Sequence, residues 1–130
     1  MMQTLQPPGW ARPKGFANGI AAQGRLVFIA GQVGWTGQGE WHERSFAGQF
    51  RQALQNIIAV LKEADGAPEH IVRLTWYVLD KQEYLASLRE VGAAYRELMG
   101  RHYPTMAVLQ VSGLVEDEAR LEIEATAVVP

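Results

Sequence analysis

Residues 26–33 read LVFIAGQV, which is the pattern of a β-strand with two apolar faces. Successive side chains of a strand point to opposite faces of the sheet. Val27, Ile29 and Val33 therefore lie on one side, and Leu26, Phe28 and Ala30 lie on the other. Two helices cover only one face of such a sheet, so the second face would remain an apolar patch of the kind that marks an interaction site. We therefore expect the protein to work as an oligomer.

The rest of the chain extends this strand into a β-β-α-β-α-β-β order. Strands are expected at residues 16–22, 71–79, 105–111 and 120–129, and a turn at Gln23 and Gly24 leads into residues 26–33. Apolar residues recur at helical spacing in residues 45–64 and 80–100, which predicts two helices. The expected fold class is α+β, with both helices packed on one face of a mixed sheet.

Length and composition indicate one domain over residues 1–130, with residues 1–11 as a loose N-terminal arm. A chain of 130 residues lies in the usual range for a single domain. The absence of cysteine excludes disulfides, a thiolate nucleophile and a cysteine-based zinc site. No apolar run approaches the ~20 residues that cross a bilayer, and no secretory signal is visible. We expect a cytoplasmic protein with no membrane partner.

Charge and motifs argue against several classes of partner. The formal net charge is −2, and the basic residues are scattered rather than arranged in the stripe that binds phosphates, so no nucleic acid is expected. The glycine-rich residues 34–41 match neither G-x-G-x-x-G nor a P-loop, and the three histidines are isolated. We therefore expect neither a cofactor nor a metal ion.

Glu122 and Glu124 are the residues that could carry acid–base chemistry. Both lie on one side of the predicted last strand, opposite Leu121 and Ile123. The pattern by itself favours a solvated strand face, and the functional alternative is a carboxylate that lines a cleft and takes up a proton. Trp35, in a loop, is equally compatible with packing and with stacking on a ligand.

Five short segments, in this order and spacing, resemble the RidA family, which is also called YjgF or the L-PSP endoribonuclease family. They read FIAGQ at residues 28–32, QFRQALQNI at 49–57, VGAAY at 91–95, YPT at 103–105 and LEIEA at 121–125. The resemblance covers residues 12–130. It implies a chorismate-mutase-like fold and a homotrimer with a central barrel and three clefts between neighbouring subunits.

The resemblance also implies an activity, the hydrolysis of reactive enamines and imines by a deaminase. The family's water-orienting glutamate falls on Glu122, which makes it the candidate catalytic residue. Four other polar positions differ: the carboxylate-gripping arginine is Met106, and the tyrosine, serine and asparagine are Phe16, Ala30 and Gly92. The cleft should therefore be wide and apolar and accept a bulky or aromatic molecule. Its expected ligand-binding residues are Phe16, Ala30, Gly31, Gln32, Trp35, Gly92, Met106 and Val108.

Two functions remain open at this point. In the first, the protein hydrolyses the C=N bond of a bulky small-molecule intermediate, with Glu122 acting on water. In the second, it is a non-catalytic trimer that binds a small metabolite or has a regulatory role. A ribonuclease activity ranks third because the chain has neither a basic patch nor a histidine pair.

Overall fold

Strand β6 (Leu121–Val129) lies inside the main sheet and connects its two halves. The computed structural model describes residues 2–130, and its main sheet has the order β3-β6-β4-β5. The other members are β3 (Arg25–Gln32), β4 (Ile71–Val78) and β5 (Thr105–Gln110). β6 is antiparallel to β3 and β4, whereas β4 and β5 are parallel. The sheet is therefore mixed, as the sequence predicts.

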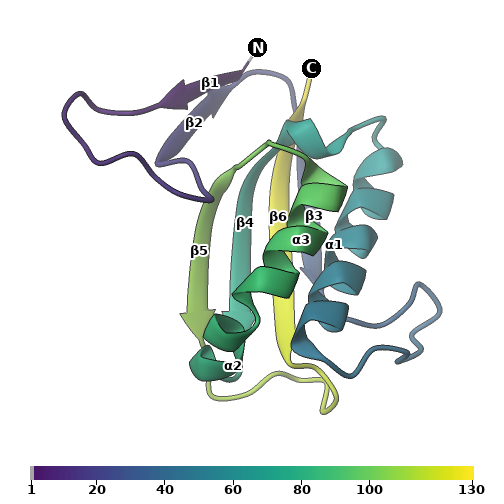
Figure 1. Ribbon diagram of the computed structural model, residues 1–130. Helices are drawn as coiled ribbons and strands as arrows, with labels where there is room; N and C mark the ends of the chain where they lie inside the picture. Colours follow the sequence, from purple (N-terminus) through teal and green to yellow (C-terminus); the bar gives the residue numbers. More distant parts are fainter. Residues whose placement is uncertain (1) are drawn as a thin grey trace.

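Helices α1 (Phe46–Lys62) and α3 (Leu88–Met99) lie side by side on one face of this sheet (Figure 1). Ser45 caps α1, and its hydroxyl oxygen accepts from the Gly48 backbone N–H at 3.0 Å. The core between the layers includes fully buried residues of α1 and of the strands: Phe50, Leu54, Ile57, Leu61, Leu74, Leu121 and Ile123. The α+β class, with the helices on one face, is confirmed.

The predicted second helix is divided in two. A short α2 (Lys81–Ala86) precedes α3, and the chain leaves helical geometry at Ser87, where φ is −103° and ψ is 4°. Asp80 caps α2 through its carboxylate, which accepts from the N–H of Gln82 at 2.9 Å. The Ser87 hydroxyl donates to the Glu83 carbonyl at 2.8 Å, which offers the backbone an alternative to a continuous helix. A 3₁₀ turn, η1 (Pro68–His70), precedes β4.

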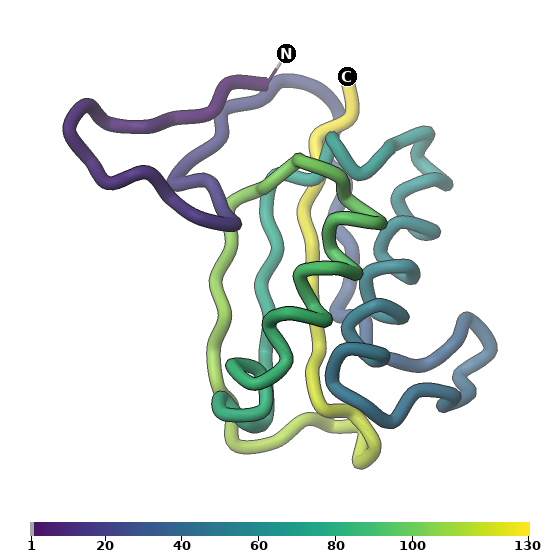
Figure 2. The backbone as a smooth tube through the Cα atoms, in the orientation of Figure 1, coloured from purple at the N-terminus to yellow at the C-terminus, as the bar shows by residue number. Residues whose placement is uncertain are grey.

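The N-terminal segment differs from the loose arm that the sequence suggests. Strand β1 (Met2–Leu5) pairs with β2 (Gly19–Ala22) in an antiparallel two-stranded sheet of its own, which projects from one end of the molecule (Figures 1 and 2). Met1 lies outside the described residues. The strand was missed because backbone pairing with a segment far along the chain, rather than an apolar alternation, holds it in place.

The turn between β2 and β3 separates two sheets instead of closing a hairpin. Gly24 has a φ of 148°, and a Cβ there would lie 2.8 Å from the backbone carbon of Val129. Only glycine permits this close approach to the end of β6.

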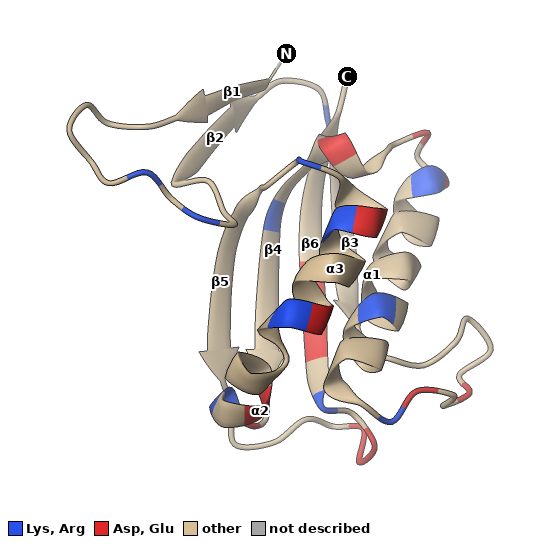
Figure 3. Cartoon of the chain, in the orientation of Figure 1, with Lys and Arg blue, Asp and Glu red and all other residues tan. Residues whose placement is uncertain are grey.

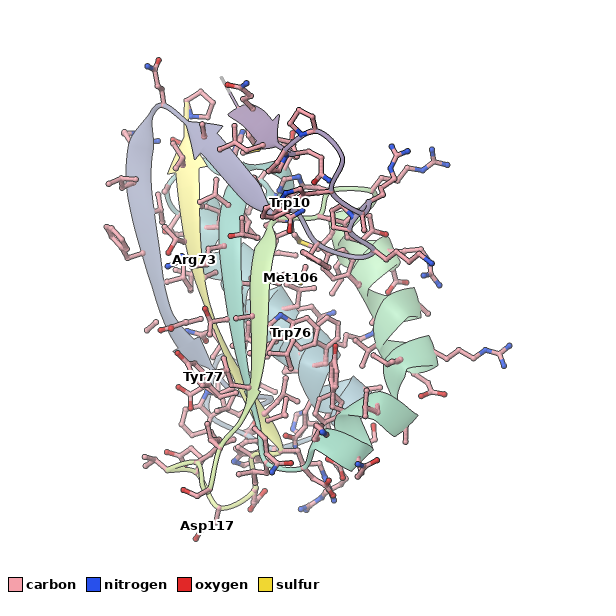
Figure 4. The ribbon with its side chains drawn as sticks, turned by 90° about the vertical axis from the view of Figure 1, so that its left-hand side faces the viewer. Trp10, Arg73, Trp76, Tyr77, Met106 and Asp117 are labelled. Carbon is pink, nitrogen blue, oxygen red and sulfur yellow. The ribbon has the colours of Figure 1, made fainter. Side chains whose placement is uncertain are left out.

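The face of the main sheet turned away from α1 and α3 is called the outer face below, and it remains uncovered in a single chain (Figure 4). Leu26 and Phe28 of β3 are 64% and 75% exposed there. The second apolar face predicted from residues 26–33 therefore exists. No helix within residues 2–130 is long and apolar enough to cross a membrane.

Candidate functional site

A cavity of about 260 Å³ opens between β4, β5 and the helices α2 and α3. Its wall is largely aromatic, with Trp76, Tyr84, Tyr95 and Tyr103, and the segment before β2 contributes Lys14 and Gly15. We call this cavity the aromatic pocket. A concave, mostly apolar site with few polar groups is typical of small-molecule binding.

The aromatic walls are held in place by contacts with one another and with residues outside the cavity. Trp76 stacks on Phe50 with ring centroids 4.8 Å apart, and its centroid lies 5.9 Å from that of Tyr84 in an edge-to-face arrangement. Tyr95 and Tyr103 stack at 5.2 Å, and the Tyr95 hydroxyl donates to the His102 carbonyl at 2.5 Å. These contacts fix the wall of the pocket within a single chain.

The polar atoms of the aromatic walls are poor proton acceptors. Burial raises the pKa of Tyr84 and of Tyr95 above the ordinary value of 10.0, so both hydroxyls stay neutral near neutral pH. The Trp76 Nε1–H is buried and has no hydrogen-bond partner within residues 2–130. The residues that line this pocket include no carboxylate and no histidine that could act as a base.

Three of the predicted ligand-binding residues meet at the aromatic pocket. Met106 and Val108 enter it from β5, and Gly92 enters it from α3. Phe16 lies in an adjoining hollow of about 320 Å³ that Met106 also lines. Figure 4 shows Met106 and Trp76 on the helix side of the sheet. The structure thus brings together four positions that are far apart in sequence.

Glu122 lies on the outer face, where Tyr77 of β4 is its direct neighbour. The carboxylate fits against Gly31 so closely that a Cβ on Gly31 would overlap it. Gly31 therefore has a steric reason to lack a side chain. Ala30 and Glu124 share a hollow of about 440 Å³ on this face.

Glu124 differs from Glu122 in its hydrogen bonding. The Tyr77 hydroxyl donates to Glu124 Oε1 at 2.6 Å. This hydrogen bond to the carboxylate raises the pKa of Tyr77, with smaller effects from burial and from the charge of Glu122. No side-chain hydrogen bond engages the Glu122 carboxylate within residues 2–130, which leaves it available to another molecule.

Gln32 and Trp35 occupy a third place, a hollow of about 430 Å³ between the glycine-rich loop and α1. The Asn56 side chain fixes this loop by donating to the Trp35 carbonyl at 2.8 Å. Trp35 packs against Trp41, with centroids 5.7 Å apart. Within one chain, this loop is separate from the aromatic pocket.

The predicted site is consequently divided within a single chain. Phe16, Gly92, Met106 and Val108 lie at the edge and helix side of the sheet, whereas Ala30, Gly31 and Glu122 lie on the outer face. Figure 4 shows Met106 on the helix side of the sheet and Tyr77, the strand partner of Glu122, on the opposite side.

Sequence reasoning missed Arg96, which also lines the aromatic pocket. Its guanidinium lies above Gly92, where a Cβ would be 3.3 Å from Nη1. The available signal was spacing, because residues four apart in a helix share one face.

Charged residues elsewhere show no concentration of one sign. Lysine and arginine are spread over the helices, the loops and the N-terminal segment (Figure 3). Within residues 2–130, no group of three or more histidine, aspartate or glutamate side chains is arranged to hold a metal ion.

The mixed sheet, its two covering helices and the apolar pocket at its edge define an α+β protein. Comparisons with known proteins are consistent with this class. The model of the family described as Endoribonuclease L-PSP matches residues 11–129. A RutC family protein of Pyrococcus horikoshii is 34% identical over 105 residues, which are 80% of this chain and 79% of the relative.

Solved structures agree. The Rid-family protein YyfB of Yersinia pestis has a TM-score of 0.87 at 29% identity, with 98% of each chain covered. The YjgF protein of Escherichia coli has a TM-score of 0.69 at 28% identity, covering 88% of each chain. The chain belongs to the RidA/YjgF family.

Proposed function

We propose that this protein is a homotrimeric hydrolase that deaminates a bulky or aromatic enamine or imine in clefts between subunits. The observation that carries the proposal is the division of the site over two faces of one sheet. Glu122 is a carboxylate without a side-chain hydrogen bond, and the aromatic pocket is a binding site without a base. Each lacks what the other has.

Association of subunits joins the two halves. The exposed Leu26 and Phe28 on the outer face favour burial against another copy. The edge strand β5 carries the pocket residues Met106 and Val108, so a neighbour that packs at this edge adds its own groups to the pocket. A trimer with a central barrel places the Glu122 of one copy beside the aromatic pocket of the next.

The chemistry needs one base and one water molecule. The Glu122 carboxylate takes a proton from water as the water oxygen attacks the carbon of the C=N bond, and it passes this proton to the nitrogen to give a neutral carbinolamine. Glu122 then takes the proton of the carbinolamine hydroxyl and delivers it to the amino nitrogen as the C–N bond breaks. Imine and water are consumed, and a ketone and ammonia are formed. The residues of the chain suffice for these proton transfers.

Pocket composition supports a large substrate. The aromatic walls and Met106 offer apolar surface and a polarisable thioether, which suit an aromatic group. A small imine would leave much of the cavity of about 260 Å³ unfilled.

The second candidate is a non-catalytic trimer that binds a small metabolite. The aromatic pocket favours it, because the apolar wall of that pocket lies within one chain and needs no Glu122 to hold an apolar group. A ribonuclease activity stays third because the basic residues are scattered (Figure 3).

A coupled assay tests the hydrolase. An amino-acid oxidase, with catalase present, generates imines from phenylalanine or alanine in situ, and semicarbazide competes with the protein for them. We expect the protein to divert the phenylalanine imine to its keto acid and to leave the alanine imine almost unchanged. Robust alanine turnover would contradict the predicted preference, and no effect on either imine would favour the binding protein.

A further inference from the structure

We propose that the buried indole N–H of Trp76 is a hydrogen-bond donor to the molecule bound in the aromatic pocket, and that this molecule carries a neutral acceptor, such as a carbonyl oxygen, on an aromatic body. This inference deepens the proposed function, because the acceptor belongs to the bulky part of the substrate. It rests on that function only for the fate of the bound molecule.

The unpaired indole nitrogen is the first reason. Trp76 lines the aromatic pocket and is 4% exposed. Among the side chains of residues 2–130, its Nε1 is the single buried nitrogen or oxygen without a hydrogen-bond partner. A buried donor without a partner is destabilising, and such groups are rare in native proteins. A molecule that supplies an acceptor recovers this loss.

The packing of Trp76 is the second reason, because it limits where an acceptor can come from. The indole stacks on Phe50 of α1 with centroids 4.8 Å apart and an interplanar angle of 22°. Phe50 is fully buried, so the core occupies this side of the ring. The space that remains for an acceptor is the pocket.

Tyr84 controls access to the donor. Its ring meets the indole edge-to-face at 5.9 Å between centroids, and it also lines the pocket. Tyr84 belongs to α2, a helix of six residues in which none is buried, so few contacts oppose its movement. Protein atoms enclose Nε1 in the structure. Rotation of the Tyr84 side chain opens Nε1 to the ligand.

The chemistry of the wall selects a neutral acceptor. An indole N–H is a donor only and carries no charge. The wall around it is largely aromatic and aliphatic, and an ionised group placed against such a wall loses its hydration without an equivalent replacement. A carbonyl oxygen or a ring nitrogen loses less hydration, and one N–H group can replace its bond to water. The aromatic body packs against the remaining wall.

Nuclear magnetic resonance of the indole N–H groups tests the inference on the full chain. The probes are acetophenone and α-methylstyrene, which have the same shape and differ in a carbonyl oxygen against a CH₂ group. We expect acetophenone to move the Trp76 indole proton downfield, and α-methylstyrene to cause no downfield shift. Equal shifts with the two probes, or no shift with acetophenone, would overturn the proposal.

Trp76→Phe identifies the donor while it keeps a ring beside Phe50. The variant removes one of the four indole signals of the chain. In calorimetry it should weaken binding of acetophenone about two- to tenfold more than binding of α-methylstyrene. Comparing the two losses cancels the effect of the smaller ring. Equal losses would contradict the hydrogen bond.

Trp10→Phe is the matched control. It makes the same change at a side chain that is 62% exposed and does not line the pocket, so it should weaken neither probe. A selective loss of acetophenone in this control would overturn the assignment to Trp76. Should Trp76→Phe fail to fold, slow exchange with solvent identifies the buried Trp76 proton in the wild type, and the shift measurement still decides.

Tyr84→Ala tests access to the donor separately. It should speed hydrogen exchange of the Trp76 indole proton, whereas Leu85→Ala, an exposed position of the same helix outside the pocket lining, should not. Unchanged exchange in Tyr84→Ala would overturn the role of Tyr84. A proton that responds to Tyr84→Ala but not to acetophenone would assign the N–H to the face of the tyrosine ring and overturn the proposal.

Turnover separates this inference from the hydrolase. A downfield shift with acetophenone, together with no turnover of aromatic imines, would retain the Trp76 donor and overturn the hydrolase. Turnover of the phenylalanine imine, together with an indole proton that acetophenone leaves unchanged, would retain the hydrolase and overturn the role of Trp76.

Discussion

The two faces of the main sheet use the same alternating strands for different purposes. On the helix side, Trp76 and its neighbours are buried, stacked and fixed by the core. On the outer face, Leu26 and Phe28 are exposed, and the Glu122 carboxylate lies against Gly31 and forms no side-chain hydrogen bond within residues 2–130. The contrast teaches that one face is covered within a single chain, whereas the outer face keeps apolar side chains exposed, which the proposed trimer would bury.

The largest expected effect is on turnover and comes from Glu122, the proposed base on the outer face. Glu122→Gln keeps the shape of the side chain and removes its ability to take a proton, so turnover of an aromatic imine should fall about 10²–10⁴-fold. Circular dichroism and light scattering should be unchanged. Glu124→Gln is the control, since Glu124 lies on the same face and should retain most of the activity. Full activity in Glu122→Gln would contradict catalysis by this residue.

Assembly should depend on the exposed apolar residues of β3. Phe28 is 75% exposed in one chain, and burying such a side chain contributes about 1.5–3 kcal/mol. Phe28→Asp should therefore convert the proposed trimer to monomers, as measured by light scattering at micromolar concentration. Because Phe28 lies outside the core, the helical signal should persist.

Val115→Asp provides the control for assembly. Val115 is 92% exposed in the turn before β6, so this change adds the same charge away from the outer face. A wild-type protein that is monomeric, or an even-numbered oligomer, would refute the trimer itself.

Substrate range should respond more modestly to a change in the aromatic pocket. A charge-assisted hydrogen bond contributes about 1.5–3 kcal/mol, or ten- to hundredfold in rate. Met106→Arg should raise kcat/KM for the alanine imine, but by less than the full ten- to hundredfold, because Phe16, Ala30 and Gly92 are unchanged. Met106→Lys should gain less, since an ammonium lacks the paired geometry of a guanidinium. Equal gains from both variants would indicate a nonspecific charge effect.

The smallest expected effect is on the free energy of unfolding and comes from Tyr95 on the helix side of the sheet. Tyr95→Phe removes the hydrogen bond to the His102 carbonyl and should lower the free energy of unfolding by about 1 kcal/mol in urea titrations. Burial raises the pKa of Tyr95, so the folded state favours the neutral phenol and its contribution is complete below pH 10.

Above pH 10 the unfolded chain loses this proton first, and stability should fall as pH rises. Tyr95→Phe should show a shallower decline than the wild type over the same range. Identical slopes would mean that Tyr95 is not protected in the folded protein.

Local patterns predicted most of the fold. The spacing of apolar residues predicted a helix at residues 45–64, and α1 spans Phe46–Lys62. The pattern missed the break at Ser87, because apolar spacing continues through it while the backbone bonds do not. It also missed β1, whose pairing with β2 is a long-range contact that leaves no periodic signal.

The site was less accessible to sequence than the fold. The positions of Met106, Gly92 and Val108 converge as expected, because the alternation along β5 and the helical face of α3 are local properties. The location of Glu122 on the opposite face follows from strand register, and the position of the Arg96 guanidinium follows from packing against Gly92. Neither the location of Glu122 nor that of the Arg96 guanidinium can be predicted from the sequence alone.

The interior position of β6 has a consequence for how the chain is made. Domains begin to fold during synthesis at about 5–20 residues per second, starting from the N-terminal side. β4 and β5 can pair as soon as both have left the ribosome, but β3 has β6 as its neighbour in the main sheet and must wait for it. Until β6 emerges, the nascent chain exposes the unpaired edge of β3 and the apolar stripe of α1. A slow stretch of translation before β6 would therefore lengthen the period in which a chaperone is needed.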